Sequence, residues 1–232
     1  MPSTKKTIYF MSSALVTAIA IGILGFAMST EWAKMTMKCG KDSDNLNGTA
    51  VITLKLFQGD LVRVSCPVFG NPQPEIFQVF PKVMEAGSSP AALHILTVCL
   101  MALCLLFSAA TILTSLYNSV SNPYENYMGP VGIYAYSSLS TCLSVLVLIL
   151  FAVNISVTSM AEELTKNIAH NDDLHLKDKS TEMQTGFYLV IPYTVLSLLA
   201  IALIYMYDHA AYTHRKEQQK PTEDAPKETM MY

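Results

Sequence analysis

The stretch Asn118–Tyr136, NSVSNPYENYMGPVGIYAY, is a short polar turn between two long apolar runs, and its only charged residue is Glu125. Residues 86–124 before it and residues 126–161 after it contain no Asp, Glu, Lys or Arg. Each run exceeds the roughly 20 residues that a helix needs to cross a hydrocarbon core of about 30 Å. The stretch therefore predicts two membrane helices that cross in opposite directions.

The composition of the whole chain extends this pattern. The chain has 232 residues, 51% of them hydrophobic and 14% charged, whereas globular chains carry about 25% charged residues. Charge is almost absent from windows 7–30, 86–124, 126–161 and 183–207. A soluble bundle would need a polar face on each helix. The predicted fold is therefore an all-α membrane protein, a four-transmembrane-helix bundle with a small extracellular β-sheet.

The boundaries of the predicted segments follow from these windows. Transmembrane helices are expected at 8–29, 91–117, 131–153 and 187–207. The segments between and beyond them are a cytoplasmic N-terminus at 1–7, an extracellular loop with a sheet at 30–90, a cytoplasmic turn at 118–130, a second extracellular loop at 154–186 and a disordered cytoplasmic tail at 208–232. In the second extracellular loop, 154–169 is expected to continue the third helix as an amphipathic extension.

Alternating side chains predict strands in the first loop. Trp32 to Cys39 and Ala50 to Phe57 each alternate apolar and polar residues, which is the period of a half-buried strand. Gln58-Gly59-Asp60 is the expected hairpin turn. A third strand would follow at Leu61 to Cys66, with its apolar face formed by Val62, Val64 and Cys66, and a weaker fourth at Glu75 to Phe80.

The cysteines and a glycosylation motif bear on which side this loop faces. Cys39 and Cys66 can form a disulfide only if the loop lies in an oxidising compartment; two free thiols are the alternative. A bridge closing that loop would contribute about 3 to 4 kcal/mol in the chain-entropy model. Asn47-Gly48-Thr49 is an N-glycosylation acceptor. Together they favour an extracellular loop and cytoplasmic termini, whereas the second acceptor, at Asn154, lies too close to the membrane for use.

The predicted helices lack the charged side chains that ion transport usually needs. None of the four predicted spans contains an Asp, Glu, Lys or Arg, and such groups are usual in pumps and ion-coupled transporters. The third helix carries hydroxyls at helical spacing, which favour packing against another helix over a pore lining; they are Ser137, Ser138, Ser140, Thr141 and Ser144. No enzyme activity, cofactor or metal is predicted, the His and Asp residues of 170–175 being interpreted as a solvated turn. Nothing in the composition indicates a nucleic-acid partner.

Four helices with a strand-rich first loop and a cysteine pair resemble the claudin and PMP-22 superfamily of tetraspan proteins. The motifs are closer to the clarin family, and the similarity covers nearly the whole chain. Leu56-Phe57-Gln58-Gly59 resembles that family's Gly-Leu-Phe-x-Gly, with Lys55 in place of the first glycine. Further motif residues are Trp32 after the first helix and, in the inner turn, Asn122, Pro123, Gly129, Pro130 and Gly132. The region 117–134 and the tail 215–226 resemble the third clarin paralogue.

This resemblance implies a glycoprotein of the plasma membrane that is not an enzyme. Clarins are linked to sensory cells, including hair cells and therefore the perception of sound, where they are thought to organise membrane, actin and channel complexes. The expected partners are membrane lipids and membrane proteins, which the sheet and helices would contact. Met230 and Tyr232 at the end of the tail also suit the groove of a PDZ scaffold. The alternatives are an auxiliary subunit of an ion channel and a claudin-like cell–cell adhesion protein.

Overall fold

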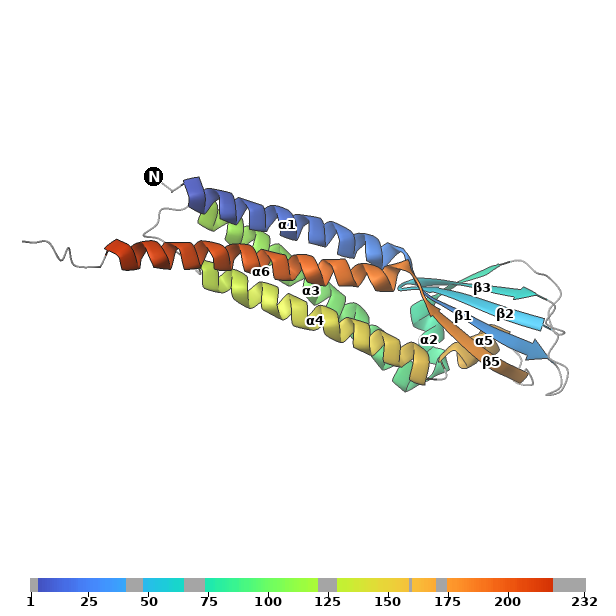
Figure 1. Ribbon diagram of the computed structural model, residues 1–232. Helices are drawn as coiled ribbons and strands as arrows, with labels where there is room; N and C mark the ends of the chain where they lie inside the picture. Colours follow the sequence, from blue (N-terminus) through green and yellow to red (C-terminus); the bar gives the residue numbers. More distant parts are fainter. Residues whose placement is uncertain are drawn as a thin grey trace, which may run out of the picture.

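The computed structural model describes residues 4–40, 48–64, 74–120, 129–158, 160–169 and 175–218. Its four long helices are α1 (Thr4–Ser29), α3 (Ser88–Val120), α4 (Gly129–Val157) and α6 (Thr185–Gln218). All four contain segments long and apolar enough to cross a membrane, which confirms the four predicted spans. They lie side by side as a bundle, with a β-sheet beyond one end (Figure 1).

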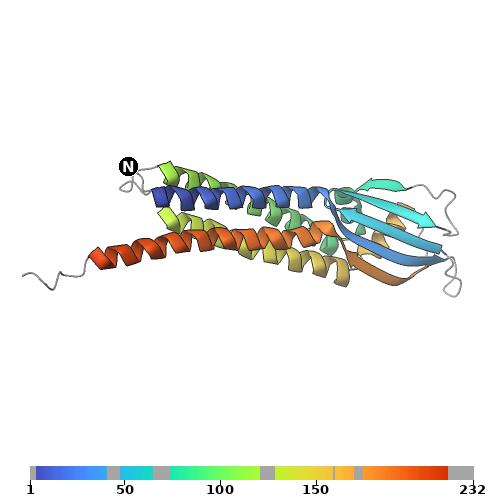
Figure 2. The same cartoon turned by 45° about the horizontal axis from the view of Figure 1, so that its top comes forward.

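The bundle is closed, because each helix packs against two others. α1 contacts α6 and α3, and α4 contacts the same two helices from the other side. The start of α1 and the end of α6 lie together at the end of the bundle that is farthest from the sheet (Figures 1 and 2). The two termini of the helical region are therefore on one side, as an even number of crossings requires.

The sheet is antiparallel and has five strands in the order β4-β3-β2-β1-β5. Their bounds are β1 (Glu31–Gly40), β2 (Gly48–Lys55), β3 (Gln58–Val64), β4 (Glu75–Gln78) and β5 (His175–Met183). β1 pairs with β2 on one side and with β5 on the other, so the second loop completes the sheet of the first. β1 and β2 bury alternate residues, which confirms the predicted apolar faces, including Met35, Ile52 and Leu54.

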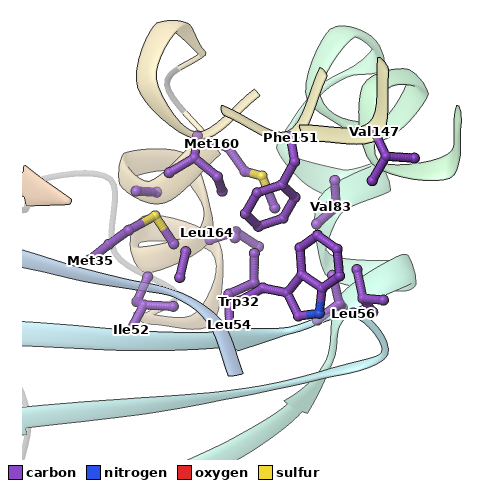
Figure 3. Close-up of a cluster of buried hydrophobic side chains, with 14 of the residues drawn as sticks. Trp32, Met35, Ile52, Leu54, Leu56, Val83, Val147, Phe151, Met160 and Leu164 are labelled. Carbon is purple, nitrogen blue, oxygen red and sulfur yellow. The ribbon is translucent and has the colours of Figure 1, made fainter. Parts of the chain in front are cut away.

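Two short helices cover one face of this sheet. α2 (Val79–Ala86) and α5 (Met160–Ala169) pack against each other, and α5 also contacts β2. We call the side of the sheet under these helices the covered face and the other side the open face (Figure 1). Met160 and Leu164 of α5 join the strand side chains in a core that continues to Phe151 of α4 (Figure 3). Sheet and bundle therefore share one hydrophobic core.

Two helix predictions are wrong at their ends. The third helix was expected to run on through 154–169, but α4 ends at Val157 and α5 is a separate helix that turns under the sheet. Residues 208–218 were expected to be disordered, but α6 continues to Gln218. Asp208–Gln218 contains neither Gly nor Pro and has several strong helix formers. Helix propagation from an existing span adds one hydrogen bond per residue without a new nucleus.

The predicted hairpin turn at 58–60 is also wrong, and the error changes a face. The turn between β2 and β3 lies at Leu56–Phe57, so Gly59 already pairs with Leu54 and Leu61 pairs with Ile52. Directly paired residues share a face, which puts Leu61 on the covered face, where it is fully buried. Val64, expected on the buried face, is 53% exposed on the open face. A register shift of one residue exchanges the two faces of a strand.

Two elements of the sheet and its covering helices were not predicted from the sequence. β5 is rich in charged residues and was assigned to a loop, and α2 occupies part of the expected fourth strand at 75–80, of which only 75–78 is extended.

The small residues Ala18, Gly22 and Gly25 on α1 are exposed and do not pack within the bundle. Nothing lies within 4 Å of a Cβ placed at either glycine.

Candidate functional site

The single tryptophan joins the bundle to the sheet. Trp32 stands at the start of β1, directly after α1, and is fully buried. Its indole Nε1 donates a hydrogen bond to the carbonyl oxygen of Ala27 at 2.7 Å, which satisfies an acceptor in the last turn of α1. Its ring meets Phe151 of α4 edge to face, with centroids 4.9 Å apart (Figure 3). One side chain thus contacts two spans and the sheet.

The start of α6 is fixed against the same side chain. The backbone N–H of Gln184 donates to the carbonyl oxygen of Trp32 at 2.9 Å. A Cβ at Gly186 would stand 2.5 Å from the indole ring and 2.9 Å from the backbone oxygen of Glu31. No real Cβ approaches so closely, so only glycine fits at this position. The close packing aligns the entry of α6 with the exit of α1.

A histidine in the membrane-length helix α3 holds the β2–β3 turn. His94 is 1% exposed, and its Nε2 lies 2.9 Å from the carbonyl oxygen of Leu56. Because a carbonyl oxygen only accepts, Nε2 carries the proton. The imidazole also meets the ring of Phe80 edge to face at 5.5 Å, and Phe80 lies beside Phe57 of the turn. The motif Leu56-Phe57-Gln58-Gly59 is therefore a docking turn between the sheet and α3.

Gly59 has a packing role in that motif. It pairs with Phe77 on β4, and a Cβ at Gly59 would overlap the Phe77 ring. Glycine weakens a strand unless a neighbour occupies the space its missing side chain leaves. The Phe77 ring, 7% exposed, occupies that space and closes the covered face at its β4 edge. We call the contacts of Trp32, His94, Gly59 and Gly186 the junction.

Inside the bundle, small hydroxyls replace large apolar side chains. Tyr193 of α6 is fully buried, and its hydroxyl hydrogen-bonds to Ser108 of α3 at 2.8 Å, to Ser140 of α4 and to the Cys104 carbonyl oxygen at 3.2 Å. Ser144 of α4 bonds to a threonine of α6 at 2.8 Å. The expectation that the hydroxyls of the third helix pack against other helices is confirmed for Ser140 and Ser144.

Two electrostatic contacts position β5. Lys179 donates from Nζ to the carbonyl oxygens of Ile155 at 2.8 Å and Thr158 at 3.2 Å, where α4 ends. A cation there complements the helix dipole. Burial lowers the pKa of Lys179, and Glu162 partly opposes that change. Lys38 forms an ion pair with Asp178 at 2.8 Å, and this hydrogen bond lowers the pKa of Asp178 and raises the pKa of Lys38.

The predicted site residues lie at the junction, at the start of α4 and in segments that the structure does not describe. Trp32, Leu56 and Gly59 are buried at the junction, and Phe57 is half exposed in the turn. Gly129 and Pro130, which were assigned to the inner turn, begin α4, and Gly132 is buried in its first turn. The remaining predicted residues lie outside the described ranges: Asn47, Cys66, Asn122, Pro123, Met230 and Tyr232.

Of the predicted disulfide and glycosylation residues, the structure describes Cys39 and Asn154 but not Cys66 or Asn47. Cys39 is fully buried on the covered face and is not among the free thiols of the described ranges, which are Cys99, Cys104 and Cys142. Cys66 lies outside the described residues, so its pairing with Cys39 stays a prediction. Asn154 is fully buried, and its Nδ2 donates to the Pro90 carbonyl oxygen at 3.3 Å, so this amide is unavailable for modification.

Sequence reasoning missed His94, Phe151, Lys179 and Gly186. Only His94 carried a usable signal, because it is the one imidazole in the charge-free run 86–124. A lone polar group in such a run needs a partner, which here is a carbonyl oxygen of the sheet. Lys179 and Gly186 owe their roles to contacts far along the chain. Within the described ranges, no three His, Cys, Asp or Glu side chains are grouped so as to hold a metal ion.

Comparison with known proteins agrees with this architecture. A family model described as Clarin-2-like matches residues 4–204. Human Clarin-3 is 29% identical over 237 residues and mouse Clarin-3 is 28% identical over 233, each alignment covering 100% of both chains. Human Clarin-1 is 26% identical over 201 residues, which is 82% of this chain and 83% of that protein. The matched residues include the four spans and both halves of the sheet.

Proposed function

This chain belongs to the clarin family of four-pass membrane proteins, and from that premise we propose that it is a non-enzymatic organiser of membrane complexes. In this role the sheet recognises partner proteins outside the cell, and the cytoplasmic tail contacts a scaffold or actin-linked complex. The observation that carries the proposal is the junction, because it packs the sheet against all four spans. A partner held on the sheet would be fixed relative to the bilayer.

The open face of the sheet is the proposed contact surface. Its side chains are mixed, with cations at Lys34 and Lys38 and isolated apolar residues at Val64 and Ile76, which are 53% and 70% exposed. A mixture of charged and apolar side chains is usual in non-obligate protein–protein interfaces. The covered face, in contrast, is filled by the protein's own α2 and α5.

The proposed location is the plasma membrane, with both termini in the cytoplasm and the sheet outside. Asn47 would carry a glycan there, and Cys39 would be bridged to Cys66. The bridge would constrain the segments around β2 and β3, so Cys39→Ser should weaken the sheet and retain the protein in the endoplasmic reticulum. Surface delivery and non-reducing mobility that both match the wild type would contradict the bridge.

At the cytoplasmic side, we propose that Met230 and Tyr232 bind a PDZ groove. A C-terminal strand adds to the edge of the PDZ sheet, and pockets take the last side chain and the one two positions before it. A peptide of the last ten residues should bind at least one domain on a PDZ array, and a Tyr232→Asp peptide should bind none. A wild-type peptide that binds nothing removes this contact.

A role in sensory cells, including the perception of sound, is part of the same proposal. An auxiliary channel subunit and a claudin-like adhesion protein are the alternatives. The hydroxyls Ser140 and Ser144 no longer favour the channel subunit, because they bond within the chain's own bundle. Adhesion predicts altered paracellular conductance when the protein is expressed in an epithelium, whereas organisation of complexes within one cell does not.

Proximity labelling tests the organiser. A labelling enzyme on the C-terminal tail of the full chain would be compared for the wild type, Ile76→Lys on the open face and Met84→Lys on α2. Both side chains are strongly exposed, at 70% and 65%, so neither change should unfold the protein. We expect Ile76→Lys, but not Met84→Lys, to lose specific membrane-protein partners at equal surface expression. Three identical sets of labelled proteins would contradict the proposal, and one stoichiometric channel would replace it by the channel-subunit role.

A further inference from the structure

A pocket of about 300 Å³ opens where the open face of the sheet meets the end of α1. It is lined by Met28 and Ser29 from the last turn of α1, Lys55, Phe57 and Gln58 from the β2–β3 hairpin, and Gln78 from β4. This volume is at the lower end of the range for small-ligand sites. The residues come from three separate elements, so the hollow is formed by the fold rather than by one loop.

The polar lining of the pocket is cationic and rich in donors. Gln58 pairs directly with Gln78, so both amides stand on the open face with Lys55. Neither Lys55 nor Glu31 belongs to the ion pairs of the described ranges, which are Lys38–Asp178, Arg63–Glu75 and Lys82–Glu85. An ammonium group with two side-chain amides beside it can bind a phosphate through charge-assisted hydrogen bonds.

The pocket lies just beyond the end of a membrane-length helix. α1 is a membrane-length helix that ends at Ser29, and the sheet begins immediately beyond it. Phe26 on α1 is 60% exposed and Phe57 in the turn is 44% exposed, so two aromatic rings stand in this zone. Interfacial belts are formed by Trp and Tyr, which carry a polar group; Phe26 has none, so its exposed ring marks the side of α1 that faces lipid tails. Lipid tails beside Phe26 would therefore place a headgroup at the mouth of the pocket.

An acidic neighbour selects among headgroups. Glu31 is the direct cross-strand partner of Lys55, is exposed, and lies at the same edge of the sheet. One cation and one anion side by side match a zwitterion better than a headgroup with net negative charge. A quaternary ammonium is also attracted to the face of an aromatic ring, which Phe57 can provide.

We propose that this pocket binds the phosphocholine headgroup of a membrane lipid. Lys55, Gln58 and Gln78 bind the phosphate, and Glu31 and Phe57 attract the choline. The bound lipid fills the space between the end of α1 and the hairpin and anchors the sheet to the bilayer surface. The site requires the four-span fold but neither the organiser role nor a particular orientation in the membrane.

Native mass spectrometry of the full chain in detergent tests the proposal. Wild type, Lys55→Gln and Lys34→Gln would be titrated with dioleoyl phosphatidylcholine. Lys34 is the matched control, because it is an exposed lysine on the same face outside the pocket. We expect Lys55→Gln to weaken binding of one lipid by about tenfold, which is about 1.4 kcal/mol, and Lys34→Gln to leave it unchanged. Equal binding by wild type and Lys55→Gln would overturn the proposal.

Three further ligands define the chemistry of the site. Dioleoylglycerol lacks the phosphate and should not occupy it. Dioleoyl phosphatidylserine should bind more weakly than phosphatidylcholine, because Glu31 repels its additional carboxylate, and the difference should disappear in Glu31→Gln. Inorganic phosphate at millimolar concentration should not displace the lipid. Displacement by phosphate would assign the pocket to a free anion, and equal or tighter binding of phosphatidylserine would refute the zwitterion.

Discussion

The bundle and the sheet place polar and apolar side chains in opposite ways. In the bundle, the outward side chains are large and apolar, such as Leu106 and Leu113, and the interior contains hydroxyls such as Ser140 and Tyr193. In the sheet, the exposed side chains include Lys34 and Lys38, and the interior is formed by large apolar groups. The two regions meet at Trp32.

This difference follows from the two solvents. Lipid tails are as apolar as leucine, so burying leucine between spans gains little, whereas close packing and hydrogen bonds between helices do stabilise a bundle. The sheet stands outside the spans, where burial of apolar area from water is the dominant favourable term. The junction must satisfy both conditions, and it does so with Trp32 and His94, which each have an apolar body and a polar nitrogen.

The largest expected effect is loss of the junction's main side chain. Trp32→Ala removes a fully buried indole that contacts three spans and the sheet, and such truncations cost about 3 to 5 kcal/mol. We expect a large drop in the temperature at which the detergent-solubilised protein loses its monodisperse elution, together with retention in the endoplasmic reticulum. Leu106→Ala, a truncation on the lipid-facing side, is the control and should change little. Equal effects of the two variants would contradict the comparison.

A pair of glycines sharpens the same comparison. Gly186→Ala places a methyl group against the Trp32 ring and the Glu31 carbonyl oxygen, and overpacking of this kind costs about 1 to 3 kcal/mol. Gly22→Ala meets nothing within 4 Å and should be neutral or slightly stabilising, because alanine favours helix. Fluorescence of Trp32, the only tryptophan, would follow thermal unfolding in both variants. A destabilised Gly22→Ala with an unaffected Gly186→Ala would reverse the assignment.

The hydroxyl network should show a smaller effect. Tyr193→Phe removes hydrogen bonds to Ser108 and Ser140 and to the Cys104 carbonyl oxygen while keeping the ring, and a hydrogen bond between spans contributes about 0.6 kcal/mol on average. We expect a loss of about 1 to 2 kcal/mol. Ser140→Ala combined with Tyr193→Phe should cost less than the sum of the single changes, because both remove one shared bond. Strict additivity would show that the pair is uncoupled.

The smallest effect is expected from the exposed pair Lys38–Asp178. The hydrogen bond to Lys38 lowers the pKa of Asp178, so this part of the stability is present above the unfolded carboxyl's pKa and is lost as pH falls through the folded value. The raised pKa of Lys38 adds stability that is present below the unfolded value and is lost as pH rises through the folded one. Unfolding curves of wild type and Asp178→Asn should therefore differ slightly near neutral pH and converge in acid. A difference in unfolding free energy between the two proteins that grows as the pH falls would contradict this assignment.

The sequence predicted an element correctly where a repeating pattern of side chains reflects a single environment, either lipid or water. The charge-free runs around Asn118–Tyr136 could only form spans, and the alternation of Trp32–Cys39 identified a strand with one buried face. Membership of the clarin family and the four-span fold followed from such local signals together with the Leu56–Gly59 motif. These features depend on neighbours in the sequence, which a single chain displays directly.

The features that the sequence did not predict depend on contacts between distant segments. β5 is an edge strand whose two large apolar residues, Leu176 and Met183, pack against the core from its two ends. Its sequence therefore shows no regular alternation, and its pairing with β1 shows where it belongs. The hairpin turn lies at Leu56–Phe57 rather than at 58–60, and Gly59 there packs against Phe77, which lies on another strand. His94 gains its role from the Leu56 carbonyl oxygen, 38 positions away. The pocket at Lys55 exists only once α1 and three strands meet.

The sheet lies beyond one end of the four spans, and the start of α1 and the end of α6 lie at the other end (Figure 1). The most direct measurement of the proposed orientation in the membrane is glycosylation and protease mapping of the full chain, carrying a C-terminal epitope, in sealed cells. We predict that Asn47→Gln abolishes a glycosidase-sensitive shift, that Asn154→Gln changes nothing, and that external protease leaves the epitope intact. An epitope removed from sealed cells, or a glycan that persists in Asn47→Gln and is lost in Asn154→Gln, would contradict the account.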